Sequence, residues 1–186
     1  MHLLGVDPLP GVNPLPRLTP DGNGQPDSSL STAAAWPGED GYGYFGEEVP
    51  YQWIEISSSG ALISGLEDEN YAGPFSIGFS FPFYGTSYSQ FMADCNGYRV
   101  LGSSGSTAYT NQCPLPNSTA PNNVIAIYWD DLMANYSSGG AYYQYFSSCP
   151  VGSGQCLVVE YLNWTHYTTE TPTPGDAGTW EAILYA

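Results

Sequence analysis

The sequence predicts an all-β protein, an antiparallel β-sandwich of the jelly-roll or immunoglobulin-like kind, preceded by an extended proline-rich arm. From residue 51 onward, short runs rich in β-branched and aromatic residues alternate with clusters of turn residues, as in a sandwich. One run, residues 75–83, alternates strictly between apolar and small or polar residues, which indicates a strand with one face on a core. No segment has the apolar spacing of an amphipathic helix.

Residues 1–40 differ in composition from the rest and form the predicted arm. Prolines recur every few residues here, together with several glycines. Because proline fixes φ and lacks an N–H, this composition keeps the chain extended and prevents a regular helix. Residues 41–186 form the predicted sandwich domain.

The strands of this domain are predicted where β-rich runs lie between turn residues. They are residues 52–57, 61–64, 75–83, 89–93, 98–101, 124–129, 141–146, 157–162 and 179–185. Turns are predicted at residues 58–60, 84–86, 96–97 and 138–140. The dipeptide Asn96-Gly97 is the strongest hairpin signal, because tight hairpin turns need positive φ at their central residues.

The charge composition limits the possible partners. The chain has no lysine and only Arg17 and Arg99 as cations, and its formal net charge is −16. Binding to phosphate backbones or anionic membranes depends on Lys and Arg, so nucleic acid and acidic membranes are excluded as partners. A hard divalent cation, calcium outside cells, suits the excess of carboxylates better. No apolar run is long enough to span a bilayer.

The four cysteines predict two disulfides. Cys95, Cys113, Cys149 and Cys156 are not arranged as close C-x-x-C pairs, which argues against a zinc ribbon. Of the possible pairings we favour Cys95–Cys113 and Cys149–Cys156, because each closes a loop between neighbouring predicted strands. Four buried free thiols are the alternative. Disulfides indicate an oxidising, extracellular environment.

Three Asn-x-Ser/Thr triplets are candidate N-glycosylation sites. They begin at Asn117, Asn135 and Asn163, each near a predicted loop or strand end. Such triplets also arise by chance in a chain rich in Asn, Ser and Thr, so an unmodified chain is the alternative.

Several motifs together resemble a known extracellular module. They are residues 73–88, 95–102, 121–132, 163–167 and 179–185. In this order they resemble a β-rich module repeated in bacterial and archaeal secreted and surface proteins, and they are similar to the nidogen-type extracellular domain. The resemblance covers about residues 42–186 and implies a secreted β-sandwich. It implies little about function, because such modules accompany proteases, adhesins and structural proteins alike.

The resemblance also implies an incomplete sheet. In that family the strand matching residues 179–185 is followed by a returning strand, whereas this sequence ends at Ala186. A missing last strand leaves a sheet edge of unpaired N–H and C=O groups. The apolar residues of the arm could supply a strand to a neighbouring copy, which would build a filament; they are Leu3, Leu4, Val6, Leu9, Val12 and Leu15. The prolines count against full pairing, and a longer chain that supplies its own strand is the alternative.

A polar segment of the arm is a candidate calcium loop. Asp21, Asn23, Gln25 and Asp27 space oxygen-bearing side chains two residues apart with glycines between them, so that they can point at one cation. A plain polar turn is the alternative. The acidic residues 67–70 are either a second metal-binding loop or a solvated turn.

No arrangement of residues indicates an enzyme. The only histidines are His2 and His166, and no Gly-x-Ser-x-Gly motif is present. Asp130 and Asp131 are adjacent on a predicted strand end, so their side chains point to opposite faces and cannot cooperate as acid and base. Capping the following turn or binding a cation is the role we expect for them.

The aromatic residues of the predicted strand 141–146 allow two interpretations. Tyr143 and Tyr145 could stack on sugar rings or seal a subunit contact, or they could fill the core. We therefore predict a non-enzymatic extracellular structural subunit that polymerises with copies of itself through its arm by donor-strand complementation. The alternatives are an adhesion or carbohydrate-binding module of a larger secreted protein, with glycans as partners, and the accessory domain of a secreted hydrolase.

Overall fold

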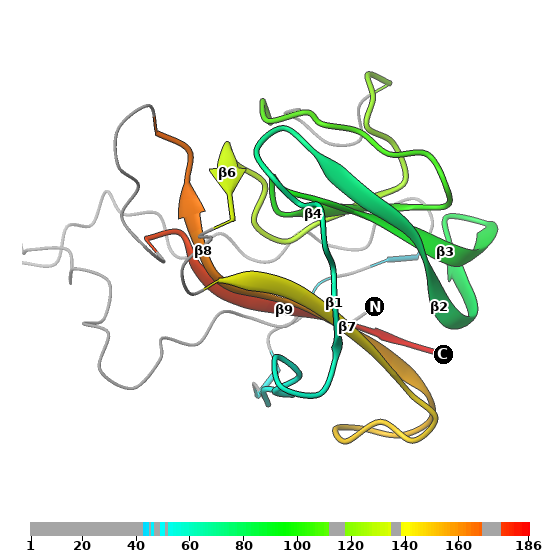
Figure 1. Cartoon of the computed structure of the whole chain (residues 1–186). Helices are drawn as coiled ribbons and strands as arrows, with labels where there is room; N and C mark the ends of the chain where they lie inside the picture. Colours follow the sequence, from blue (N-terminus) through cyan, green and yellow to red (C-terminus); the bar gives the residue numbers. More distant parts are fainter. Residues whose placement is uncertain are drawn as a thin grey trace, which may run out of the picture.

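The protein is a sandwich of two antiparallel sheets packed face to face (Figure 1). The computed structural model describes residues 43, 44, 46, 49, 50, 52–111, 118–134, 139–168 and 176–186. Within these residues there is no helix, and none that could cross a membrane. The predicted all-β sandwich is therefore confirmed. The arm, residues 1–40, lies outside the described residues, and its extended structure stays a prediction.

Five strands form the first sheet and four form the second. The first sheet contains β1 (Ala61–Leu62), β7 (Gly140–Phe146), β8 (Cys156–His166), β9 (Gly178–Tyr185) and β6 (Leu132–Met133). Its order is β1-β7-β8, with β9 on the other side of β8 and β6 paired to the last residues of β8. The second sheet contains β2 (Tyr71–Phe83), β3 (Thr86–Asp94), β4 (Tyr98–Leu101) and β5 (Val124–Ala126), paired in that order.

The alternating pattern of β2 determines which face meets the first sheet. Ile77, Phe81 and Phe83 are buried in the core, whereas Ser76 and Ser80 are exposed. The predicted inward face of this strand is thereby confirmed. Apolar side chains stand on one side because successive residues of a strand point to opposite faces.

The core between the sheets is built around the side chains of β8 that face β3 and β4. The Tyr161 hydroxyl donates to the Asp94 carbonyl at 2.7 Å, and the Trp164 indole N–H donates to the Cys95 carbonyl at 2.7 Å. Arg99, the only Lys or Arg among the described residues, is buried beside them. Its Nη2 donates to the Val159 carbonyl at 3.0 Å, and its guanidinium lies 4.9 Å from the centre of the Tyr161 ring. These contacts join the two sheets through buried polar groups.

The turn between β3 and β4 is the hairpin predicted at Asn96-Gly97. Gly97 has φ of 79°, a conformation that favours glycine. Its surroundings are equally restrictive, since a Cβ at this position would lie 1.9 Å from the Tyr128 carbonyl oxygen. The side chain of Asn96 accepts the Leu132 N–H at 2.9 Å. The turn therefore also positions the segment that leads into β6.

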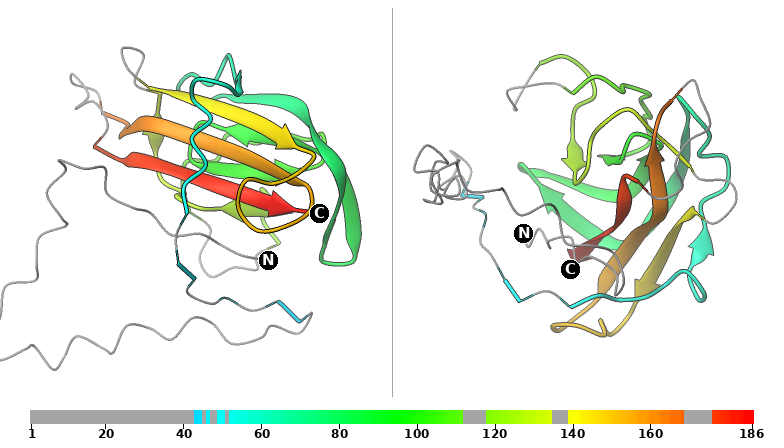
Figure 2. Two further views of the ribbon diagram at one scale, coloured as in Figure 1. Left: turned by 90° about the horizontal axis from the view of Figure 1, so that it is seen from below. Right: turned by 90° about the vertical axis from the view of Figure 1, so that its left-hand side faces the viewer.

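The main departure from the predicted strands is the segment of residues 52–57, here called the strap. It is not a strand of either sheet but crosses the outer face of the first sheet, passing over β9, β8 and β7 (Figure 2, left). Its backbone N–H groups bind side-chain carboxylates instead of another strand, as described below. Smaller differences are that β5 is shorter than predicted, β8 is longer, and β6 was not predicted.

The structure predicts that Gly97→Ala destabilises the fold far more than Gly154→Ala does. Both glycines have φ near 80°, but nothing lies within 4 Å of a Cβ placed at Gly154. A left-handed conformation costs an alanine roughly 1–2 kcal/mol, and the collision with the Tyr128 carbonyl adds roughly 1–3 kcal/mol. Urea unfolding of both variants measures the difference, and equal losses of stability would contradict the role assigned to the Tyr128 contact.

Candidate functional site

The open edge of β9 is the first candidate for an interaction site. Among the described residues, β9 pairs only with β8. The Ala186 N–H donates to the Gln155 carbonyl beside β8, and successive residues of a strand direct their backbone groups to alternate sides. Leu184 therefore also faces β8, whereas Ile183 and Glu181 direct their N–H and C=O groups to the other side. This edge can pair with an added strand.

Both faces of β9 are already covered. Trp180 and Leu184 belong to the core between the sheets, whereas Ile183 packs under the strap. The central residues of this strand are buried accordingly. A partner at this margin would therefore be recognised through the backbone, the mode in which an extended segment extends a sheet.

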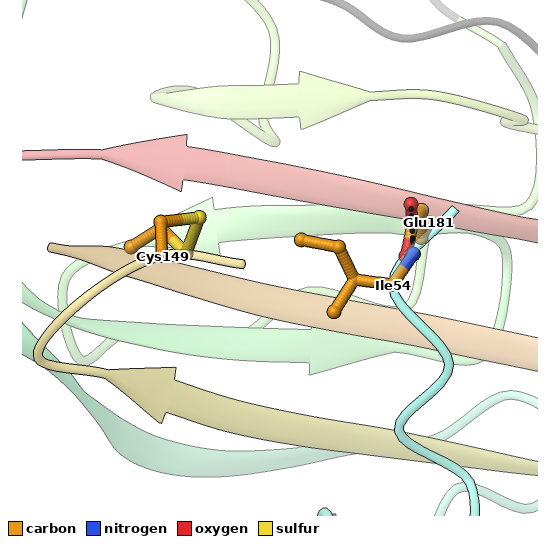
Figure 3. Close-up of a disulfide and its surroundings, with 4 residues drawn as sticks. Ile54, Cys149 and Glu181 are labelled. Atoms are coloured by element: carbon orange, nitrogen blue, oxygen red, sulfur yellow. Dashed lines mark hydrogen bonds between the residues drawn. A yellow bond between two sulfur atoms is a disulfide. The ribbon is translucent and has the colours of Figure 1, made fainter. Parts of the chain in front are cut away.

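The strap is held on the first sheet by two glutamates. The Ile54 N–H donates to the Glu181 carboxylate on β9 at 3.2 Å (Figure 3). The Ile56 N–H donates to Glu160 on β8 at 3.0 Å. Farther along the chain, the Ser59 hydroxyl donates to the side chain of Gln144 on β7 at 2.8 Å. The chain thus crosses the sheet from β9 to β7.

An apolar cluster and a disulfide lie under the strap. Ile54 and Ile56 pack with Val158, Ile183 and the Cys149–Cys156 disulfide, whose Cα atoms are 5.3 Å apart. Figure 3 shows Ile54 and this disulfide on the first sheet. This disulfide is the predicted one, and it closes the turn between β7 and β8.

Glu160 and Glu181 are unusual because two acids lie directly opposite each other in a buried position. They are cross-strand partners in the register of β8 and β9, and their exposed fractions are 0% and 3%. Burial raises the pKa of Glu160 to about 7 and that of Glu181 to about 8. The N–H donors of the strap act against these shifts, while the nearby Glu55 carboxylate adds to both. The pair therefore retains protons near neutral pH.

A cluster of three carboxylates joins two acidic segments that are distant in sequence. One ligand atom each from Asp68, Glu69 and Asp131 lie within 4.8 Å of one another. Burial and the neighbouring carboxylates raise the pKa of Glu69 and of Asp131. One oxygen each of Asp68 and Asp131 is buried without a hydrogen-bond partner. Three oxygen ligands of this kind could hold a hard cation such as calcium.

A groove of about 350 Å³ lies at the end of β4, between residues 102–106 and 120–123. The residues that line it include Tyr88, Ser104, Ser106, Asn122 and Asn123. No charged residue lines it. It therefore offers an aromatic surface together with hydroxyl and amide groups.

A comparison with protein families identifies the sandwich. A family model described as NIDO related matches residues 42–186, which is most of the chain. The protein belongs to the nidogen-related family. No curated protein and no solved structure matches it. The match supports the nidogen-like domain predicted from the motifs, while the bacterial or archaeal secreted origin stays a prediction. Family and disulfide together are consistent with an extracellular location.

The predicted sugar-stacking tyrosines of the nidogen-related domain mostly serve packing. The Tyr143 ring lies 4.8 Å from the Phe75 ring and 5.9 Å from the Phe91 ring, so it contacts the second sheet. Tyr145 is 40% exposed and lies against Gly78, where an added Cβ would be 2.3 Å from its ring. For Tyr143, the structure favours the core interpretation over sugar stacking.

The predicted Cys95–Cys113 disulfide needs correction. In this nidogen-related domain Cys95 is a free, buried thiol, and its sulfur accepts the Asn70 N–H at 3.3 Å. Burial raises the pKa of Cys95 to about 12, which keeps it protonated and unreactive. Cys95 directly follows β3, with its side chain enclosed by the core. Cys113 lies outside the described residues.

The neighbours of His166 and Asn163, both on β8, indicate that these two residues serve the fold. His166 lies between two carboxylates, 3.4 Å from Asp176 and 3.7 Å from Asp130. Asn163 lies at the irregularity in the β8–β9 pairing and has φ of 51°. The hydroxyl of Thr165, the third residue of its triplet, is buried and donates to Asp176 at 2.7 Å. Glycosylation of Asn163 stays a prediction.

The remaining predicted site residues lie outside the described residues. They are Asn117 and Asn135 of the glycosylation triplets, Asp21, Asn23, Gln25 and Asp27 of the calcium loop, and the apolar residues of the arm. The acidic cluster was not predicted as a unit, although each of its segments was flagged. Its two segments meet only because Asp131 and the 67–70 loop approach each other in the folded chain.

We expect calcium to raise the melting temperature of the nidogen-related domain through the acidic cluster. In calcium-free buffer, Asp131→Asn should raise the melting temperature slightly, because it removes repulsion from Asp68 and Glu69. With millimolar calcium the wild type should gain stability and the variant should gain less. Thermal unfolding with and without calcium measures both effects.

The matched control is Asp130→Asn, which neutralises the neighbouring carboxylate outside the cluster and should keep the calcium response. A wild-type melting temperature that calcium leaves unchanged would contradict a cation site here. A response that survives in Asp131→Asn would place the ion elsewhere, for example at residues 21–27.

Proposed function

We propose that the protein is a non-enzymatic structural subunit of an extracellular filament, in which the arm of one copy adds a strand to the β9 edge of the next. The observation that carries this proposal is that β9 is covered on both faces while, among the described residues, it pairs only with β8. Such an edge is a template for pairing with another chain.

The path of the strap supports this assignment. Ile54 contacts β9 through Glu181, and the chain then proceeds toward β7. The strap therefore begins beside the open edge. The predicted arm, residues 1–40, is long enough when extended to reach well beyond its own domain, since an extended chain spans roughly 3.3–3.6 Å per residue. Head-to-tail addition of this kind does not close on itself and grows into a filament.

The charge of the chain supports contacts made through the backbone. Arg99 is buried in the core, so the described surface has no Lys or Arg to form ion pairs between copies. Membership of the nidogen-related family supports an extracellular module. Copies of the chain are the partner in this proposal, and backbone hydrogen bonds with apolar contacts from the arm hold them together.

The test is to combine an arm deletion with point variants and to observe the particles by electron microscopy. The full chain should form ordered polymers, and deletion of residues 1–18 should give dispersed particles with an unchanged circular dichroism spectrum. Val6→Asp with Leu9→Asp should also weaken assembly, because charged side chains cannot be buried in the contact. The matched control, Asn13→Asp, adds charge without removing an apolar residue and should still assemble.

Two outcomes would contradict the proposal. Polymers formed by the protein without residues 1–18 would exclude the arm as donor. A full chain that stays monomeric at high concentration would exclude assembly. This result is expected if the arm pairs with the β9 edge of its own copy, or if that edge accepts no added strand.

A second candidate is a carbohydrate-binding module, which the groove beside Tyr88 favours. Aromatic rings stack on sugars, and the uncharged hydroxyl and amide groups of this groove suit a neutral polyhydroxyl ligand. An array of neutral oligosaccharides should retain the wild type and lose Tyr88→Ala, whereas Tyr109→Ala, at an exposed tyrosine outside the groove lining, should still bind. Absence of binding, or equal binding by Tyr88→Ala, would count against this candidate.

A further inference from the structure

Two backbone N–H groups of the strap donate hydrogen bonds to the sandwich, and both acceptors are glutamate side chains. The Ile54 and Ile56 N–H groups donate to Glu181 and Glu160, which face each other across β8 and β9. Between these two contacts the side chain of Glu55 points to solvent, where it accepts hydrogen bonds from Ser57. The closed strap thus depends on the protonation state of a single pair of carboxyl groups.

The surroundings of this pair provide little compensation for negative charge. Glu55 on the strap adds repulsion, and Tyr185 on β9 is neutral, with a pKa that burial and Glu181 raise further. Arg99 attracts Glu181, but it lies on the core side of the sheet against Val159 and Tyr161. One oxygen of Glu160 is buried without a hydrogen-bond partner. Two ionised carboxylates would therefore repel each other in a site without a matching cation.

The sign of the pH dependence follows from these groups. Opening the strap exposes the two glutamates to water, which brings their pKa back toward the ordinary value of 4.5. When it is closed, burial raises their pKa to about 7 and about 8. A raised pKa in the closed state means that closure is favoured at low pH and loses its advantage as the pH rises through 7 to 8.

We infer that the strap is a pH-sensitive latch at the root of the arm, closed on Glu160 and Glu181 in mildly acidic solution and released when both are ionised. Release uncovers Val158, Ile183 and the Cys149–Cys156 disulfide on the outer face of the first sheet. It also detaches the chain from β9 beside the open edge. The effect on assembly rests on the proposed function, whereas the opening of the strap does not.

Amide hydrogen exchange of the full chain, measured residue by residue between pH 5.5 and 8.5, tests the latch. The protection factors of Ile54 and Ile56, corrected for the intrinsic pH dependence of exchange, should fall by roughly tenfold or more over this range, since each pH unit between a group's open-state and closed-state pKa changes the equilibrium about tenfold. Protection of the core strand β8 should stay constant. A flat protection profile at Ile54 and Ile56 would overturn the inference.

The decisive variant is Glu160→Gln with Glu181→Gln, which keeps the acceptor oxygens but cannot ionise. Its strap protection should not change with pH, whereas the control Glu67→Gln, at a remote exposed glutamate, should behave like the wild type. An unchanged pH dependence in the double variant would assign the opening to other groups.

Two further measurements keep the test decisive. If the double variant does not fold, Glu181→Gln alone should retain only part of the wild-type pH dependence, and a full wild-type response would contradict the latch. Reduction of the Cys149–Cys156 disulfide by a phosphine should also accelerate with pH in the wild type alone. Electron microscopy of the same samples separates the two proposals: a strap that opens without polymers at any pH supports the latch and contradicts the filament.

Discussion

The structure depends on the burial of β8 on both of its faces. Strands paired on both sides and covered on both faces must find a partner for every polar group they carry. On the core side, Tyr161 and Trp164 satisfy this requirement by donating to carbonyls at the end of β3, which locks the two sheets together. On the outer side, one carboxylate oxygen of Glu160 accepts the Ile56 N–H, while the other is buried without a hydrogen-bond partner. The same requirement therefore fixes the sandwich and places the strap.

The distribution of charge follows from the shortage of cations. Arg99 is used inside, where its guanidinium contacts Val159 and Tyr161, so no described Lys or Arg balances the carboxylates at the surface. The acids are consequently either solvated, gathered in the cluster around Asp131, or kept protonated by burial. Glu160 and Glu181 belong to the last group. In a protein with more surface cations, an ion pair would be the ordinary way to hold a strap in place.

Local patterns of the sequence predicted the fold well, because alternation and turn chemistry act over few residues. The strand of residues 75–83, the Asn96-Gly97 turn and the Cys149–Cys156 disulfide are examples. The strap was predicted as a strand because Ile54 and Ile56 alternate with polar residues, and alternation reports an extended backbone with one buried face. It does not report which group accepts the N–H, and here the acceptors are carboxylates more than 100 residues away.

The candidate sites were harder to predict because they depend on contacts between distant segments. Asp131 meets the 67–70 loop only in the folded chain, and the groove beside Tyr88 likewise joins separate loops. For the two glutamates a signal was present: each is a charged residue in the middle of an apolar strand run, at 157–162 and 179–185. Buried acids in such positions need a hydrogen-bond donor. An extended segment that pairs with no strand, such as residues 52–57, can supply backbone N–H groups for this purpose.

The proposed filament contact and the proposed latch both involve β9. Two copies of a chain with a net charge of −16 repel each other, and ion pairs across their described surfaces would require cations that are absent there. In the proposed filament, attraction would come from backbone hydrogen bonds, each contributing about 0.5–1.5 kcal/mol net, and from apolar burial, while salt screens the repulsion over about 10 Å at 0.1 M. The free energy of such a contact is only marginally favourable per residue. Small changes in the position of the arm would therefore change the affinity between copies. Because the strap joins the sheet at β9 itself, the protonation of Glu160 and Glu181 acts at the place where that position is determined.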